Sequence, residues 1–246
     1  MTIPARLLVS GAGSGIGRAV CSLALSTGSS VAALDKNTEG LAAVRGEGAC
    51  AITTDVADEA SVVTAVADAI ALLGGPPDAV ICTAGIYRFE PALGLTAERF
   101  REMLEVNTIG SFLVARESVR AMRDAGTSGA VVLLASIATE GGDIAEPAAH
   151  YSASKGAILA LTRQLAVEWA ELGVRVNAVS PGVIQTPMLR ITDDPAAAET
   201  YLRSRVPLHR LGQAEEVARA CLWLAGPDSS YTTGSVLAVD GGASVG

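Results

Sequence analysis

The chain has 246 residues, of which half are hydrophobic, 18% are charged and 4% are aromatic. This composition excludes a disordered chain, a collagen-like repeat and a coiled coil, and a chain of this length can bury roughly three-quarters of its unfolded surface. The net charge of −8 argues against a protein that binds duplex nucleic acid or anionic membrane surfaces, because both would repel it.

Short apolar runs alternate with longer helical stretches from one end of the chain to the other. In chain order we expect strands at residues 6–10, 30–35, 50–54, 78–82, 130–135, 174–180 and 235–239, and helices at residues 15–26, 59–73, 98–125, 151–172 and 214–225. Most of the strand candidates are continuously apolar, which is typical of strands covered on both faces. The alternation predicts one α/β domain over residues 1–246, with a Rossmann-like, doubly wound parallel sheet of about seven strands and helices on both faces.

The cysteines and the apolar runs indicate the cellular compartment and argue against a metal site. Four cysteines lie far apart without a CxxC pair, and with two His the chain has no plausible metal cluster. No apolar run approaches the roughly 18 residues that a membrane span needs, and the amino terminus does not resemble a secretory signal. We therefore expect a cytoplasmic protein with free thiols, without a metal and without a membrane partner.

A Gly-rich turn follows the first expected strand and leads into a helix. Gly11, Gly15 and Gly17 give the spacing G-x-x-x-G-x-G, and glycines let backbone N–H groups approach a pyrophosphate at the positive end of a helix. Asp35 ends the second expected strand, where a carboxylate can accept both hydroxyls of an adenosine ribose and would repel a 2′-phosphate. The pattern favours NAD over NADP, although the neighbouring Lys36 could partly offset that repulsion.

Tyr151 and Lys155 stand four residues apart, so that the phenol and the ammonium project from one face of the expected helix. A nearby cation favours the phenolate and is expected to lower the tyrosine pKa from about 10 toward the working range. A phenolate can take a proton from an alcohol, and a phenol can give one to a ketone.

Two polar residues are candidates to complete this site. Ser136 comes just after the fifth expected strand, where it could orient the reacting oxygen; a strand-end serine without a function is the alternative. Asn107 lies inside an apolar helical stretch and is either a site residue or a hydrogen-bonded core amide.

Together these residues resemble the short-chain dehydrogenase/reductase family in its single-domain form, from Ser10 to Gly242. In this resemblance Asp55 and Val56 match the pair that holds adenine. The segment 82–85 matches the family's Asn-Asn-Ala-Gly, with Cys82 and Thr83 in place of the two Asn. The residues expected to bind the cofactor are Gly11, Ser14, Gly15, Ile16, Gly17, Asp35, Asp55, Val56, Ala84, Gly85, Tyr151, Lys155, Pro181, Gly182, Ile184 and Thr186.

The resemblance also implies a catalytic tetrad of Asn107, Ser136, Tyr151 and Lys155. Tyr151 would be the general acid and base, while Lys155 would lower its pKa and bond the nicotinamide ribose. Ser136 would hold the substrate oxygen, and Asn107 would fix a water that relays protons past Lys155. Ser136 lies 15 residues before Tyr151, two more than is usual in the family, so the loop 139–147 is longer and Thr139 is a substitute for Ser136 if the loop runs differently.

The segments expected to line the substrate pocket are residues 87–89, 140–150 and 188–209. They mix apolar groups such as Ile191 with the acids Asp143 and Glu146 and the cation Arg190. Residues 187–208 are expected to form a mobile lid that excludes water from the reaction.

The expected function is an NAD-dependent oxidoreductase that interconverts a secondary alcohol, a diol or a cyclic alcohol with its ketone. An NADPH-dependent 3-oxoacyl thioester reductase is an alternative within the family, but such enzymes commonly carry an Arg in the phosphate loop, where this chain has Ser14. A catalytically idle NAD-binding regulator or scaffold is the alternative outside enzymes, and the complete tetrad speaks against it.

The expected helix from Lys155 to Leu172 is apolar over more than one face. A single contact with the sheet would leave part of this surface exposed to water. Since similar family members form tetramers through the corresponding helices, the expected assembly is a homotetramer; a deeply buried helix in a monomer is the alternative.

Overall fold

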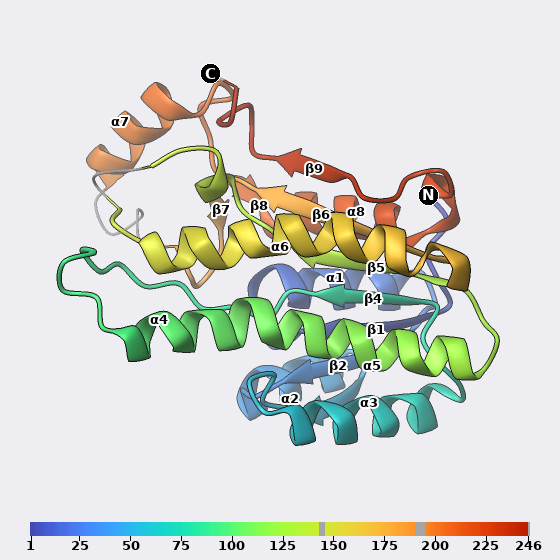
Figure 1. The fold of residues 1–246 in the computed structure, drawn as a ribbon. Helices are drawn as coiled ribbons and strands as arrows, with labels where there is room; N and C mark the ends of the chain where they lie inside the picture. Colours follow the sequence, from blue (N-terminus) through green and yellow to red (C-terminus); the bar gives the residue numbers. More distant parts are fainter. Residues whose placement is uncertain (143–145, 190–194, 246) are drawn as a thin grey trace.

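The central sheet has seven parallel strands in the order β3-β2-β1-β4-β5-β6-β9 (Figure 1). The computed structural model describes residues 1–142, 146–189 and 195–245. The strands are β1 (Arg6–Ser10), β2 (Ser30–Asp35), β3 (Cys50–Thr53), β4 (Ala79–Cys82), β5 (Gly129–Leu134), β6 (Val174–Pro181) and β9 (Val236–Val239). The predicted doubly wound parallel sheet is confirmed, and its order reverses between β1 and β4, where ligands bind in such sheets.

Helices cover both faces of the sheet, as Figure 1 shows. One core packs α1 (Gly15–Ser26), α2 (Thr38–Gly46) and α8 (Ala214–Ala225) on one face, and the other packs α3 (Glu59–Leu73), α5 (Ser111–Asp124) and α6 (Ala149–Glu168) on the opposite face. The central strands are buried from both sides, which explains why they read as continuous apolar runs. None of these helices, nor any other in the described ranges, is long and apolar enough to cross a membrane.

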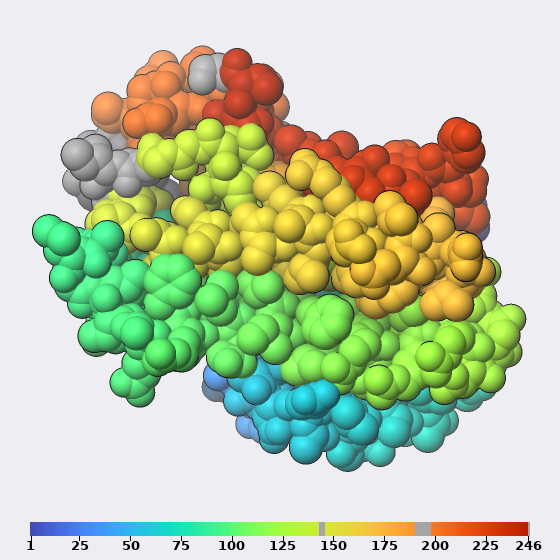
Figure 2. Space-filling model, in the orientation of Figure 1, coloured from blue at the N-terminus to red at the C-terminus, as the bar shows by residue number. Residues whose placement is uncertain are grey.

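Two helices were not foreseen from the sequence. The short α2 begins after Asn37, whose side chain accepts hydrogen bonds from the backbone N–H groups of Glu39 and Gly40, and glycines at both ends of its sequence obscure the helical pattern. The second, α7 (Pro195–Arg205), stands with the carboxyl terminus as a ridge above the face formed by α5 and α6 (Figure 2). A short parallel pair, β7 (Ile184–Gln185) with β8 (Gly212–Gln213), was also missed.

The predicted helix 98–125 is interrupted. It consists of α4 (Ala97–Leu104), a π-helical segment at Glu105–Gly110 and α5. A π-helical turn inserts an extra residue per turn and re-aims the side chains on it, which is why such turns recur at functional sites. Here the segment carries Asn107 into the protein interior.

The remaining differences are at element boundaries. The predicted helix 151–172 corresponds to α6, which ends at Glu168. A separate 3₁₀ turn, Ala170–Leu172, covers the rest of the predicted range.

Candidate active site

The Gly-rich turn between β1 and α1 packs directly against the chain that leaves β4. Gly11 has a φ of 72°, and a Cβ atom there would lie 2.5 Å from the backbone nitrogen of Ala84, so only glycine permits this approach. Ser14 precedes α1 but its side chain does not cap the helix, and the first turn of α1 holds no acidic residue. The positive helix end is therefore available to an anion such as a diphosphate.

This turn forms one wall of a cavity of about 210 Å³ at the carboxyl edge of the sheet. Its lining contains these residues predicted to bind a cofactor: Gly11, Ser14, Gly15, Ile16, Gly17, Asp35, Asp55, Val56, Ala84, Gly85 and Thr186. Lys36 and Thr83 line it as well. The combination of an uncapped helix end, a carboxylate and an apolar side chain at Val56 fits the diphosphate, ribose and base of a dinucleotide.

The Asp35 carboxylate is held by backbone groups. Its Oδ2 atom accepts a hydrogen bond from the Gly13 N–H at 2.9 Å, and its Oδ1 atom accepts one from the Asn37 N–H at 2.8 Å. A carboxylate offers about four acceptor sites, so these two bonds fix its orientation and leave capacity for two ribose hydroxyls.

A second cavity, of about 460 Å³, adjoins the first and shares Ile16, Gly85 and Thr186 with it. Its lining contains the remaining predicted residues Ser136, Tyr151, Lys155, Pro181, Gly182 and Ile184. Of the tetrad, three members therefore reach one cavity, beside the groove that fits a dinucleotide.

The three side chains are arranged around the Tyr151 ring. Ser136 is close enough to the Tyr151 hydroxyl to lower its pKa, and the Lys155 Nζ atom lies 5.8 Å from the ring centroid. Lys155 donates a hydrogen bond to the carbonyl oxygen of Leu134 at 2.8 Å. On another side, the Tyr87 ring meets the Tyr151 ring edge to face, with 4.5 Å between centroids.

The predicted lowering of the Tyr151 pKa by Lys155 is wrong for this structure. Burial raises the pKa of the Tyr151 phenol above its usual value near 10, and the neighbouring Ser136 hydroxyl only partly opposes this. Burial also lowers the pKa of Lys155, to about 8. Desolvation disfavours the charged form of both groups, and the ammonium is directed to a backbone carbonyl instead of to the phenol.

The structure distinguishes Ser136 from its alternative, Thr139. Ser136 lines the cavity, whereas the Thr139 hydroxyl turns back and donates a hydrogen bond to the Ser136 carbonyl oxygen at 2.8 Å. With the longer loop, Ser136 and not Thr139 therefore lines the cavity.

Asn107 lies behind the cavities, in the lining of neither. Its side chain is fully buried and holds the backbone of Ile86 from both sides: Oδ1 accepts from the Ile86 N–H at 2.8 Å, and Nδ2 donates to the Ile86 carbonyl at 3.0 Å. Nδ2 also donates to the Ser154 hydroxyl at 3.1 Å. The amide thus ties the segment after β4 to α6, and its predicted role in holding a water stays a prediction.

The pocket-lining predictions have mixed outcomes. Tyr87, Glu140, Glu146, Met188 and Leu189 line the larger cavity.

Other residues of that prediction lie elsewhere. Arg88 is paired instead with Glu102 of α4, and Asp143, Arg190 and Ile191 lie outside the described residues. The predicted lid 187–208 includes α7, which contributes Tyr201 and Arg205 to the lining; its motion stays a prediction.

The carboxyl-terminal segment supplies lining residues that sequence reasoning missed. Ala243 and Ser244 border the larger cavity, because the Asp240 carboxylate accepts hydrogen bonds from the N–H groups of Gly242 and Ser244 and folds the chain back. The Asp-Gly-Gly sequence after the last strand was the available signal for this turn.

Comparison with known proteins agrees with this geometry. Residues 11–244 match the model of a protein family described as enoyl-(acyl carrier protein) reductase. The chain is 38% identical to a 2,5-dichloro-2,5-cyclohexadiene-1,4-diol dehydrogenase of Sphingobium indicum, over 96% of this chain and 95% of that protein. It is 40% identical to a galactitol 2-dehydrogenase (L-tagatose-forming) of Cereibacter sphaeroides, over 96% of this chain and 94% of that protein.

A solved structure is similar over nearly the whole length. The crystal structure of a short-chain type dehydrogenase/reductase from Mycobacterium marinum superposes with a TM-score of 0.90 at 33% identity, covering 98% of this chain and 96% of that chain.

Proposed function

The chain belongs to the short-chain dehydrogenase/reductase family, and we propose that it is an NAD-dependent enzyme that interconverts a secondary alcohol, in particular a diol or cyclic alcohol, with its ketone. That it is an oxidoreductase follows from its family and its dehydrogenase relatives. The observation that carries the rest is the meeting of Tyr151, Ser136 and Lys155 on a cavity that adjoins the Asp35 groove. The names of both relatives, which act on hydroxylated compounds, support the substrate class.

In the proposed mechanism the protein supplies the proton path and the alignment. During oxidation the Tyr151 phenolate takes the proton of the substrate hydroxyl, and during reduction the phenol returns it to the carbonyl oxygen. Ser136, which lines the same cavity as Tyr151, holds the same substrate oxygen and fixes its distance to the phenol. A nicotinamide cofactor held in the groove beside Tyr151 and Lys155 would supply the two-electron, hydride-transfer chemistry.

Lys155 binds the cofactor in this proposal. Its ammonium, which donates a hydrogen bond to the Leu134 carbonyl oxygen, would donate further hydrogen bonds to a ribose hydroxyl next to the nicotinamide.

We infer NAD as the cofactor from Asp35. Its carboxylate stands in the groove with its orientation fixed by two backbone N–H groups, where a 2′-phosphate would bring a second negative charge close to it.

A screen of secondary alcohols, diols and ketones tests the proposal, with nicotinamide absorbance followed for NAD and NADP separately. The expected result is turnover of cyclic or short-chain diols with NAD and much less with NADP. Strong preference for NADPH together with reduction of a 3-oxoacyl thioester would replace the proposal with the thioester reductase. Absence of turnover with every compound and both cofactors would favour an idle NAD-binding protein.

We further infer a homotetramer in the cytoplasm. The four cysteines are free thiols in the structure, which suits a reducing compartment. The helix α6, visible beside α5 in Figure 2, carries Val167 with a largely exposed side chain, and its Leu159 and Leu161 pack against the core but are only partly buried. Such a surface is suited to another copy of the chain. Light scattering at micromolar concentration is expected to give four copies, and a monomer would contradict the inference.

A further inference from the structure

Glu146 lines the same cavity as Tyr151 and Ser136, and the proposed mechanism gives its carboxylate no task. The side chain is partly buried. Its Oε2 atom accepts a hydrogen bond from the Tyr87 hydroxyl at 2.8 Å, so the carboxylate has a defined position in the cavity.

Tyr87 links this carboxylate to the proposed acid and base. The rings of Tyr87 and Tyr151 are 4.5 Å apart between centroids, at an interplanar angle of 62°, and Phe89 packs against the other side of Tyr87 with 4.9 Å between centroids. Burial and the neighbouring Glu146 carboxylate both raise the pKa of Tyr87, which keeps the phenol protonated as a donor. Tyr87 therefore lies between Glu146 and Tyr151 and contacts both of them.

The carboxylate keeps room for a ligand. An ionised carboxylate can accept about four hydrogen bonds, and Tyr87 supplies one. Within the described ranges of the chain, no Lys or Arg forms an ion pair with Glu146, although Arg205 borders the same cavity. A ligand hydroxyl that donates a hydrogen bond to Glu146 therefore strengthens binding, whereas an anionic group at the same place is repelled by the carboxylate.

We propose that Glu146 is a specificity-determining residue, which accepts a hydrogen bond from the second hydroxyl of a diol while the first hydroxyl lies at Tyr151 and Ser136. This inference rests on the proposed function, and it narrows the substrate class to uncharged diols and polyols. Monohydric alcohols lack the second donor, and hydroxy acids carry a carboxylate that Glu146 disfavours.

The test compares two substrates in the same enzyme preparation: cyclohexanediol, in its cis and trans isomers, and cyclohexanol. Wild-type enzyme is expected to favour at least one diol in kcat/KM. Glu146→Gln is expected to lower kcat/KM for that diol by roughly tenfold to hundredfold, the usual cost of a lost charge-assisted hydrogen bond, and that for cyclohexanol far less. Because the ratio of the two values does not depend on how much of the variant folds, partial misfolding leaves the test valid.

Glu215→Gln is the matched control. Glu215 is exposed on α8 and lies in the lining of neither cavity, so its loss should leave the diol-to-cyclohexanol ratio unchanged. Tyr87→Phe, which frees the Glu146 carboxylate, should lower the ratio by a smaller factor than Glu146→Gln.

The outcomes separate this inference from the proposed function. A fall in the ratio for Glu146→Gln, without one for Glu215→Gln, supports the role of Glu146. An unchanged ratio in Glu146→Gln, with wild-type enzyme active on cyclohexanol, overturns that role and leaves the proposed function standing. If wild-type enzyme oxidises no alcohol with either cofactor, the proposed function fails, and the role of Glu146 fails with it.

Discussion

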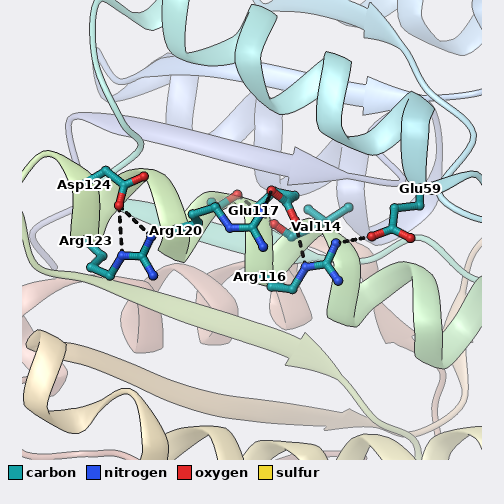
Figure 3. A network of polar contacts seen from close by, with 8 residues as sticks. Glu59, Val114, Arg116, Glu117, Arg120, Arg123 and Asp124 are labelled. Atoms are coloured by element: carbon teal, nitrogen blue, oxygen red, sulfur yellow. Dashed lines mark hydrogen bonds and ion pairs between the residues drawn. The ribbon is translucent and has the colours of Figure 1, made fainter.

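Charged side chains at the carboxyl edge of the sheet and those along α5 are held in opposite ways. On α5 the charges are paired with each other: the buried Glu117 carboxylate accepts hydrogen bonds from Arg116 at 2.7 Å and Arg120 at 2.8 Å (Figure 3). At the sheet edge Asp35 and Lys155 are held by backbone groups and face cavities.

The difference shows how a fold keeps charge available for chemistry. A carboxylate shared by two guanidinium groups has few acceptor sites left for a ligand. Its removal would instead destabilise the fold, because it would leave the two cations without their partner. A carboxylate or ammonium oriented by backbone groups keeps its charge for a bound molecule while its position is still fixed. Substitutions in the two regions should therefore affect different measurements, and the following predictions start from the largest expected effect.

Tyr151→Phe should abolish most of the turnover. Loss of the phenolic hydroxyl removes the proposed general acid and base, which contributes about 10²- to 10⁴-fold to the rate. Steady-state kcat for alcohol oxidation measures this loss, while cofactor binding by fluorescence titration should change little. Tyr231→Phe is the control, because Tyr231 is fully exposed. Turnover that survives unchanged in Tyr151→Phe would disprove the proton role.

Asp35→Asn should weaken the use of NAD by roughly 10- to 100-fold in kcat/KM, because a charge-assisted hydrogen bond to the ribose is lost. The same change should raise kcat/KM for NADP, since the repulsion of a 2′-phosphate is removed. Asp68→Asn on the exposed side of α3 is the control for a loss of one negative charge. Equal effects of Asp35→Asn on both cofactors would count against the ribose contact.

The pH dependence should differ between the two directions of the reaction. Because burial raises the pKa of Tyr151, the phenol predominates near neutrality. The phenolate fraction then grows up to about tenfold per pH unit. Oxidation, which needs the phenolate, should accelerate from about pH 6 to about pH 7.5, while reduction, which needs the phenol, should stay nearly constant. Lys155, with a pKa of about 8, keeps most of its charge over this range. Initial rates in both directions provide the check, and a flat oxidation profile would contradict the assignment.

The candidate site residues at the carboxyl edge of the sheet could be predicted from the sequence, because they belong to short local patterns. The Gly-rich turn, Asp35 and the pair Tyr151–Lys155 each follow from spacing within one element or at its end, and parallel strands then bring those ends together. The sheet itself followed from the apolar runs, since strands covered on both faces carry a strong signal.

The rest depends on distances that no local pattern encodes. The direction of the Tyr151 pKa shift follows from burial, which spacing alone does not show. The contact of Tyr87 with Glu146 joins residues 59 positions apart. The break in the helix before α5 arises at a π-helical segment whose sequence, Glu105–Gly110, has no proline to mark it.

Glu117→Gln should leave both cavities intact and lower stability instead. Glu117 is buried between Arg116 and Arg120, and Arg116 also pairs with Glu59 of α3 (Figure 3), so a neutral amide leaves two cations less well compensated. We expect a loss of about 1–3 kcal/mol in the free energy of unfolding, measured by urea denaturation. Asp124→Asn removes the partner of Arg123 in an exposed pair on the same helix and should cost less than about 0.5 kcal/mol. Similar losses for the two variants would mean that burial does not distinguish these pairs, and a fall in kcat for Glu117→Gln would contradict the division of tasks between α5 and the sheet edge.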